Sequence, residues 1–162
     1  LAAGRMTLAN IAREIAAGSE FALETTLSGS STLAAMKRAF AAGYLIDFTY
    51  LCLRSPRMNV GRVSMRVAAG GHHVPEDDVL RRYSRSLGNL PTAAALADRG
   101  RIFDNTDDAG PKLIFEMRER RILFVRRELP EWFQRAFEMD DAGEAPAAHI
   151  EQRLTELREQ RR

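Results

Sequence analysis

The chain has 162 residues, 45% of them hydrophobic, which suffices for one compact domain with a core but leaves little room for two. The formal net charge is only +2, so the sequence lacks the strong basic field typical of nucleic-acid-binding proteins. No apolar run approaches the roughly 20 residues of a membrane-spanning helix, and a single cysteine, Cys52, excludes an internal disulfide. We therefore expect a protein of the reducing cytoplasm, without membrane or nucleic acid partners.

The first segment has neither the basic region, apolar run and cleavage site of a secretory signal nor an initiator methionine before Leu1. Apolar residues recur at helical spacing from Met6 to Ala16, and Gly18 is a typical terminator, so the pattern predicts a helix ending near Ala17. Because the chain starts inside a segment expected to be structured, we expect a truncated product, a gene fragment or a chain trimmed at its start.

Strands and helices are expected to alternate after this helix. In chain order, the pattern predicts a short strand Phe21–Thr26, a helix Ser31–Ala42, a buried strand Tyr44–Leu53, a helix from Pro56 toward Ala69, a helix from Pro75, a short helix Thr92–Asp98 and a strand Arg101–Asp104. The apolar clusters KLIFEM and RILFV then predict a hairpin, and Pro130 begins a helix. A polar linker, Asp140–Pro146, leads to a last amphipathic helix that carries Ile150, Leu154 and Leu157 on one stripe.

This order of elements predicts an α/β fold with three layers, in which the first strands of the sheet are parallel. We expect one domain over residues 1–139, followed by the polar linker and the C-terminal helix over residues 140–162. In a sheet of this kind, ligands bind beyond the carboxyl ends of the strands.

The segment GGHHVPEDDVLRRYSRSLGNL, Gly70 to Leu90, places a paired-glycine turn, a histidine and a proline directly before an arginine-rich helix. Four arginines flank this turn: Arg66, Arg81, Arg82 and Arg85. A guanidinium group matches two phosphate oxygens at once, which an ammonium group cannot do. The segment therefore predicts a binding site for an anion, with phosphate as the first ligand class.

Together with FALETTLSG (Phe21 to Gly29) and RIFDNT (Arg101 to Thr106), this segment resembles the zeta-toxin-like P-loop kinases, including the proteins described as predicted ABC-type ATPases. The three motifs occur in the family's order and span about the first two thirds of the chain. The resemblance implies a P-loop-kinase-like domain with a mostly parallel sheet. It also implies ATP and Mg²⁺ as cofactors, and a kinase that transfers phosphate to a small hydroxyl-bearing acceptor, which is a UDP-amino sugar in the toxin branch.

One part of the family pattern is absent from the chain. A Walker A loop requires G-x-x-x-x-G-K followed by Ser or Thr, and neither of the two lysines, Lys37 and Lys112, lies in such a sequence. We therefore expect the sheet to lack its first, phosphate-loop strand, which is the central one. The chain is expected to be inactive alone, or to work with a separate phosphate-loop segment.

By the same resemblance, Glu24, Arg66 and Arg82 would be the catalytic residues. Glu24 would contact substrate or metal-bound water, and the alternative is a solvated glutamate at a strand end. Arg66, Arg81 and Arg82 would clamp phosphates. Because adjacent helical residues point about 100° apart, either Arg81 or Arg82 is expected to lie on the surface or to pair with Asp77 or Asp78.

The remaining candidates would bind nucleotide or substrate: Thr25, Thr26, His72, Arg81, Asp104 and Asn105. His72 would hydrogen-bond substrate, or would only anchor the backbone of its turn. Asp104 and Asn105 would precede the base of the nucleotide, or would simply form a turn, which both residue types favour. No metal site built from protein ligands is expected, since the histidines and the cysteine form no cluster.

Two classes of function remain open at this point. One is a zeta-toxin-like ATP-dependent phosphotransferase present as a fragment, with an antitoxin as a further partner. The other is a non-catalytic remnant, or an interaction and binding protein. A helical DNA-binding module would require a clustered basic helix, which the mixed charge along the chain argues against.

Overall fold

The structure is a computed structural model, and it describes residues 2–139 and 146–160. The described part of the chain contains six helices: α1 (Ala2–Ala17), α2 (Ser30–Ala41), α3 (Pro56–Ala68), α4 (Glu76–Leu96), α5 (Glu131–Ala136) and α6 (Pro146–Glu159). It contains four strands: β1 (Asp47–Cys52), β2 (Arg99–Asp104), β3 (Lys112–Arg118) and β4 (Arg121–Val125). The expected helices at both ends and the expected hairpin, β3–β4, are confirmed. Residues 140–145 of the predicted linker lie outside the described residues.

The four strands form one mixed sheet in the order β1-β2-β3-β4. β1 and β2 are parallel, as the sequence predicts, whereas β2–β3 and β3–β4 are antiparallel. The sheet is therefore not mostly parallel, because the two strands after β2 are joined by short connections, which can only produce antiparallel neighbours. β1 pairs directly with β2 along its full length, so the described strands leave no gap for a further central strand.

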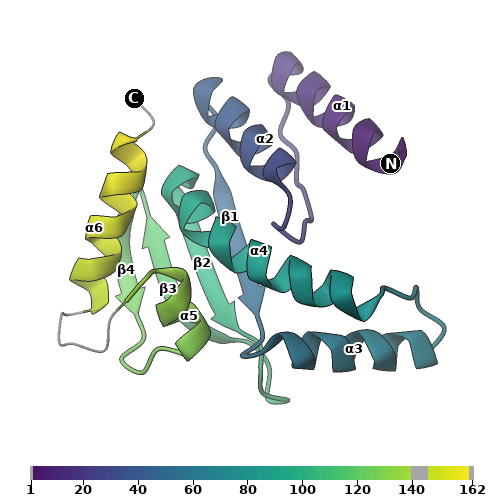
Figure 1. Cartoon of the computed structure of the whole chain (residues 1–162). Helices are drawn as coiled ribbons and strands as arrows, with labels where there is room; N and C mark the ends of the chain where they lie inside the picture. Colours follow the sequence, from purple (N-terminus) through teal and green to yellow (C-terminus); the bar gives the residue numbers. More distant parts are fainter. Residues whose placement is uncertain (1, 140–145, 161–162) are drawn as a thin grey trace.

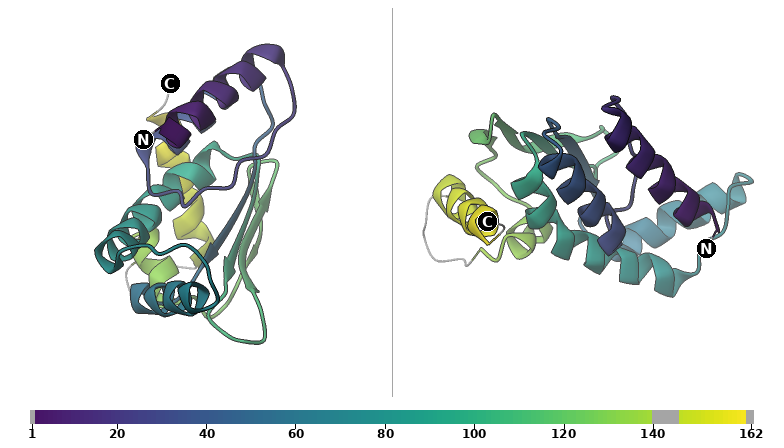
Figure 2. Two further views of the ribbon diagram at one scale, coloured as in Figure 1. Left: turned by 90° about the vertical axis from the view of Figure 1, so that its right-hand side faces the viewer. Right: turned by 90° about the horizontal axis from the view of Figure 1, so that it is seen from above.

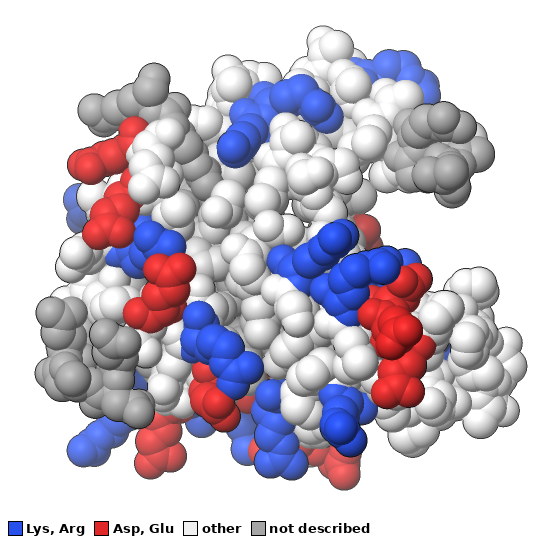
Figure 3. Space-filling model, viewed as in Figure 1, with Lys and Arg blue, Asp and Glu red and all other residues white. Residues whose placement is uncertain are grey.

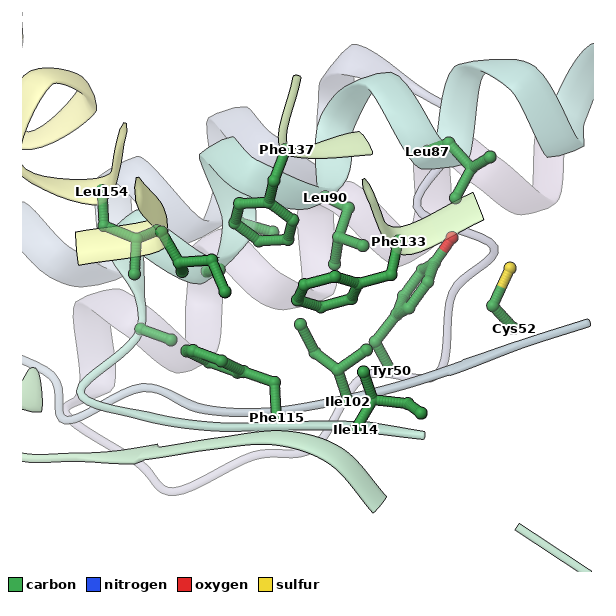
Figure 4. Close-up of a cluster of buried hydrophobic side chains, with 14 of the residues drawn as sticks. Tyr50, Cys52, Leu87, Leu90, Ile102, Ile114, Phe115, Phe133, Phe137 and Leu154 are labelled. Atoms are coloured by element: carbon green, nitrogen blue, oxygen red, sulfur yellow. The ribbon is translucent and has the colours of Figure 1, made fainter. Parts of the chain in front are cut away.

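The helices lie on one side of the sheet (Figures 1 and 2). The core forms between this side of the sheet and the helices α4, α5 and α6, and its largest fully buried side chains include Trp132, Phe115, Phe133 and Phe137. Figure 4 shows the three phenylalanines together with Tyr50, Leu90 and Leu154. The other side of the sheet has no helix over it among the described residues, so the chain is a mixed α/β protein in which the expected third layer is not seen.

The predicted strand Phe21–Thr26 is wrong, because this segment is irregular coil. Ala22, Leu23 and Glu24 are all exposed, so the segment has no apolar side that could pack as a strand. Leu27, which follows the segment, is 2% exposed and has a positive φ of 56°. The amide of Asn89 on α4 donates a hydrogen bond of 2.8 Å to the Leu27 carbonyl.

The predicted short helix Thr92–Asp98 is also wrong as a separate element. α4 continues through Pro91 to Leu96 as a single helix of 21 residues. A proline in a helix interior costs about 3 kcal/mol, but the residues around Pro91 are the most buried of the helix, with Leu90, Ala93 and Ala94 all at 0% exposure. Burial of this apolar stretch outweighs the lost backbone hydrogen bond.

Within the residues that the structure describes, no helix combines the length and the apolar character needed to cross a bilayer.

Candidate functional site

A cavity of about 370 Å³ opens at the carboxyl end of β1, between this strand and the helices α3 and α4. Three arginines line it: Arg62 and Arg66 of α3, and Arg82 of α4. The other lining residues are uncharged, and they are Thr26, Tyr50, Leu51, Cys52, Leu53, Asn59, Val63, Val74, Val79, Tyr83, Ser86 and Asn105. We call this the arginine cavity. Since no carboxylate lines it, its electrostatic potential is positive.

Local turns place the arginines. Pro56 at the first turn of α3 starts this helix directly after β1, and the helix ends at the Gly70-Gly71 turn. Gly70 has a φ of +88°, which favours glycine, and the Gly71 amide donates a hydrogen bond of 2.8 Å to the Arg66 carbonyl. The chain then reverses into α4, so that Arg66 and Arg82 approach one cavity from two antiparallel helices.

The three arginines differ in what already binds them. Arg62 Nη2 donates a hydrogen bond of 2.7 Å to the Asn105 carbonyl, and Arg66 Nη2 donates one of 3.1 Å to the His72 carbonyl. Arg82 is exposed and has no hydrogen-bond or ion-pair partner among the described residues. The guanidinium of Arg82 is therefore available for an anion, and those of Arg62 and Arg66 keep further free N–H donors.

The floor of the cavity is buried and electrically neutral. The hydroxyl groups of Tyr50 and Ser86 share a hydrogen bond of 2.9 Å, and the Tyr83 hydroxyl donates one of 2.9 Å to the Leu53 carbonyl. Burial raises the pKa of Cys52 to about 11 and raises the pKa values of Tyr50 and Tyr83 well above their ordinary range. These groups stay protonated at neutral pH, so they do not offset the charge of the arginines.

Of the residues proposed from the sequence, the structure brings four to this cavity: Thr26, Arg66, Arg82 and Asn105. Arg81 points elsewhere, because its Nη2 lies 2.6 Å from Asp78 Oδ1 in an ion pair one helical turn apart. The expected division between the two adjacent arginines is thus confirmed. Figure 3 shows basic side chains beside acidic ones over the first half of α4.

The remaining candidates do not line the arginine cavity. Glu24 is exposed and has no described partner, although it lies only two residues before Thr26. Thr25 is occupied locally: its Oγ1 lies 3.0 Å from Thr32 Oγ1 and accepts a hydrogen bond from the Leu27 amide. Both residues belong to the irregular segment that the sequence predicted as a strand.

His72 and Asp104 have structural contacts. His72 has an exposed side chain, and its carbonyl receives the Arg66 hydrogen bond, in keeping with a histidine in a turn. Asp104 accepts hydrogen bonds from Trp132 Nε1 at 3.1 Å and from the Thr106 amide at 2.8 Å. The Asp104 carboxylate therefore holds its own turn and α5, and it faces a different cavity.

Arg62, Asn59 and Tyr83 also line the cavity, and none of them was predicted from the sequence. Arg62 precedes Arg66 by one helical turn, so the spacing alone places both on the same face of α3. Tyr83 could not be found in this way, because its role depends on the Leu53 carbonyl, 30 residues away.

Among the residues that the structure describes, no three His, Cys, Asp or Glu side chains gather closely enough to hold a metal ion.

Comparisons with known proteins identify no family. No family model matches the chain, and no solved structure matches it. One relative, a protein of Haemophilus influenzae described as uncharacterized, is 38% identical over 63 residues, which are 39% of this chain and 45% of the relative. The match thus spans less than half of that protein's length, and its description assigns no activity.

Proposed function

We propose that the arginine cavity binds the phosphate groups of a nucleotide or phosphate ester, and that the chain is part of a zeta-toxin-like, ATP-dependent phosphotransferase. Its acceptor would be a small hydroxyl-bearing molecule, with a UDP-amino sugar as the candidate from the resemblance. One observation carries the proposal: three arginines and no carboxylate line a cavity at the carboxyl ends of the two parallel strands.

In this proposal Arg82 makes the first contact with the phosphate, because its guanidinium is exposed and unoccupied. Arg66 and Arg62 approach from α3 and add charge, while Asn59 supplies an amide donor at the same wall. The buried floor, with Tyr50 and Ser86, receives the uncharged part of the ligand. Charge-assisted hydrogen bonds of this kind contribute about 1.5–3 kcal/mol each.

The cavity supplies only part of what phosphoryl transfer needs. Mg²⁺ prefers oxygen ligands, carboxylates above all, and no carboxylate lines this site. The residues present therefore do not fit a protein-bound Mg²⁺, and we assign no step to the ion. Asp104, next to Asn105, is held by Trp132 and the Thr106 amide. Glu24, two residues before Thr26, would act only if its segment were repositioned.

The same observation favours a second candidate, which is a non-catalytic protein that binds phosphate compounds. A cavity with phosphate-binding arginines but without a base or a metal ligand can hold a ligand without transforming it. The two candidates agree on binding and differ only in chemistry.

Calorimetric titration with ATP, with and without Mg²⁺, tests the binding. We expect Arg82→Ala and Arg66→Ala each to weaken the affinity by about tenfold or more, because each removes a charged donor. Arg81→Ala is the matched control, since it removes the same charge from the adjacent residue, which is paired with Asp78. The affinity of this variant should stay within about twofold of the wild-type value.

Absence of any binding by the wild-type chain, or equal losses in all three variants, would refute the phosphate site. A phosphotransfer assay with labelled ATP and a UDP-amino sugar then separates the two candidates. Transfer that is lost in Arg82→Ala supports the kinase, and binding without transfer supports the non-catalytic protein.

A further inference from the structure

The side of the sheet opposite the helices, visible edge-on in Figure 2, is formed by alternate residues of each strand. We call it the open face, and it consists of Asp47, Thr49 and Leu51 of β1, Arg99, Arg101 and Phe103 of β2, Leu113, Glu116 and Arg118 of β3, and Arg121 and Phe124 of β4. None of these residues belongs to the core cluster. The open face is therefore a second surface, which meets the arginine cavity at Leu51.

Apolar side chains form a continuous row across three strands of the open face. Leu51 lies opposite Phe103 in the strand register, and Phe103 lies opposite Leu113. Leu51 is 52% exposed, and Phe124 in the neighbouring row is 41% exposed. Single exposed apolar residues are common on protein surfaces. An exposed row of apolar residues across a parallel strand pair is unusual, because parallel strands are normally covered on both faces.

Charged residues on the open face are predominantly basic. Four arginines, Arg99, Arg101, Arg118 and Arg121, stand against two acids, Asp47 and Glu116. The closest ion pair among them joins Arg101 Nη2 and Asp47 Oδ1 at 3.8 Å, which leaves most of the positive charge uncompensated. The row Asp47–Arg99–Arg118–Arg121 crosses the sheet at the end opposite the apolar row.

We propose that the open face docks an acidic amphipathic helix of a partner protein. The apolar stripe of such a helix would cover Leu51, Phe103 and Phe124, and its carboxylates would meet the arginines. Strands of five to seven residues offer a platform about 20 Å long, which a helix of about 13 residues spans. A second copy of this chain fits less well, because two open faces pressed together would oppose arginine to arginine.

Two labelled 18-residue peptides test the proposal by fluorescence anisotropy. Both carry leucines at helical spacing i, i+3, i+4 and i+7; one has glutamates at the flanking positions, and the other has lysines. We expect the acidic peptide to bind the full chain at least about tenfold more tightly than the basic one. Its affinity should fall as salt increases, because exposed charges are screened.

Variants locate the contact. Arg101→Glu and Phe124→Ser should each weaken the affinity for the acidic peptide at least about fivefold. Arg57→Glu, an equal charge reversal on the helical side, should change this affinity less than about twofold. Equal affinity for the two peptides, no binding of either, or equal effects of Arg101→Glu and Arg57→Glu would overturn the proposal. So would a concentration-dependent dimer in light scattering that Phe124→Ser abolishes, because a second copy would then be the occupant.

Discussion

Gly71 is packed closely against the residue that it helps to position. A Cβ atom at this position would lie 2.6 Å from Arg66 Cγ and 2.8 Å from the Arg66 carbonyl oxygen. Real side chains do not tolerate such contacts, so a larger residue must displace either the turn or the arginine. The glycine therefore links the geometry of the turn to the charge in the arginine cavity.

We expect Gly71→Ala to destabilise the chain by about 1–3 kcal/mol and to weaken ATP binding, because it moves Arg66. Gly61→Ala is a suitable control, since Gly61 lies inside α3 with nothing within 4 Å of the added Cβ. That substitution should stabilise the helix by about 0.5–1 kcal/mol. Urea denaturation and calorimetry measure the two effects. Wild-type affinity in Gly71→Ala would contradict the expected displacement of Arg66.

Cys52 should make the free energy of unfolding fall at alkaline pH. Its thiol has an ordinary pKa of 9.0, and burial raises the pKa to about 11 in the folded chain. Above pH 9 the thiol ionises in the unfolded chain but not in the folded one, so the stabilisation is complete below pH 9 and is lost as pH rises toward 11. We expect the wild-type chain to lose about 1 kcal/mol more than Cys52→Ala between pH 8 and pH 10. Urea denaturation of both proteins at these pH values measures the difference, and parallel losses would contradict it.

Among the elements, α3 is the least anchored helix that contributes to the site. It has no buried residue, and its main neighbour is α4. α4, by contrast, buries nine residues, including Leu87, Leu90 and Leu96. Two of the three arginines of the cavity therefore stand on a helix with little apolar packing of its own.

Amide hydrogen exchange should show this asymmetry. We expect the amides of α3 to exchange at least about tenfold faster than those in the second half of α4, because opening α3 exposes little apolar surface. A saturating phosphate ligand should slow exchange in α3 and leave α6 unchanged, since α6 is remote from the cavity. Equal protection of α3 and α4 in the free chain would contradict this expectation.

Elements with clear local signals could be predicted from the sequence. Pro56 and Gly70 bound α3, and the apolar clusters of the hairpin formed β3 and β4 as expected. The errors arose where tertiary contacts decide. Pro91 lies within α4 because the helix is buried around it. Phe21–Thr26 stays irregular, and Ala22 and Leu23 within it are exposed.

The candidate site shows the same division. Arg66 and Arg82 flank one turn, so their position at the same cavity follows from sequence spacing. The contact between Asp104 and Trp132 does not follow from sequence spacing, because Trp132 lies 28 residues further along the chain and reaches Asp104 only through the packing of α5. The open face could not be predicted either, since it depends on which side of the sheet the helices occupy.

At the scale of the whole molecule, α6 closes the core against α4 and the sheet. Leu154 and Ile150 are 0% exposed, and both belong to the same cluster as the aromatic residues of α5. The C-terminal helix is thus integral to the described fold.

We expect Leu154→Ala to lower the free energy of unfolding by about 2–5 kcal/mol, because it leaves a cavity in this core. Leu123→Ala, at a residue that is 60% exposed, should change it by less than about 0.5 kcal/mol. Circular dichroism and calorimetry should give the same midpoint for each protein, as expected when one core unfolds cooperatively. A separate early transition in Leu154→Ala would show instead that α6 detaches alone.

The single indole of the chain stands directly behind the arginine cavity. The Trp132 ring lies 6.4 Å from the ring of Tyr50, which lines the cavity. The Nε1 of Trp132 donates a hydrogen bond to Asp104. A ligand that settles on Tyr50 would alter the polarity around one buried chromophore. The protein thus carries an intrinsic fluorescent reporter of occupancy, whose emission can be followed without a label.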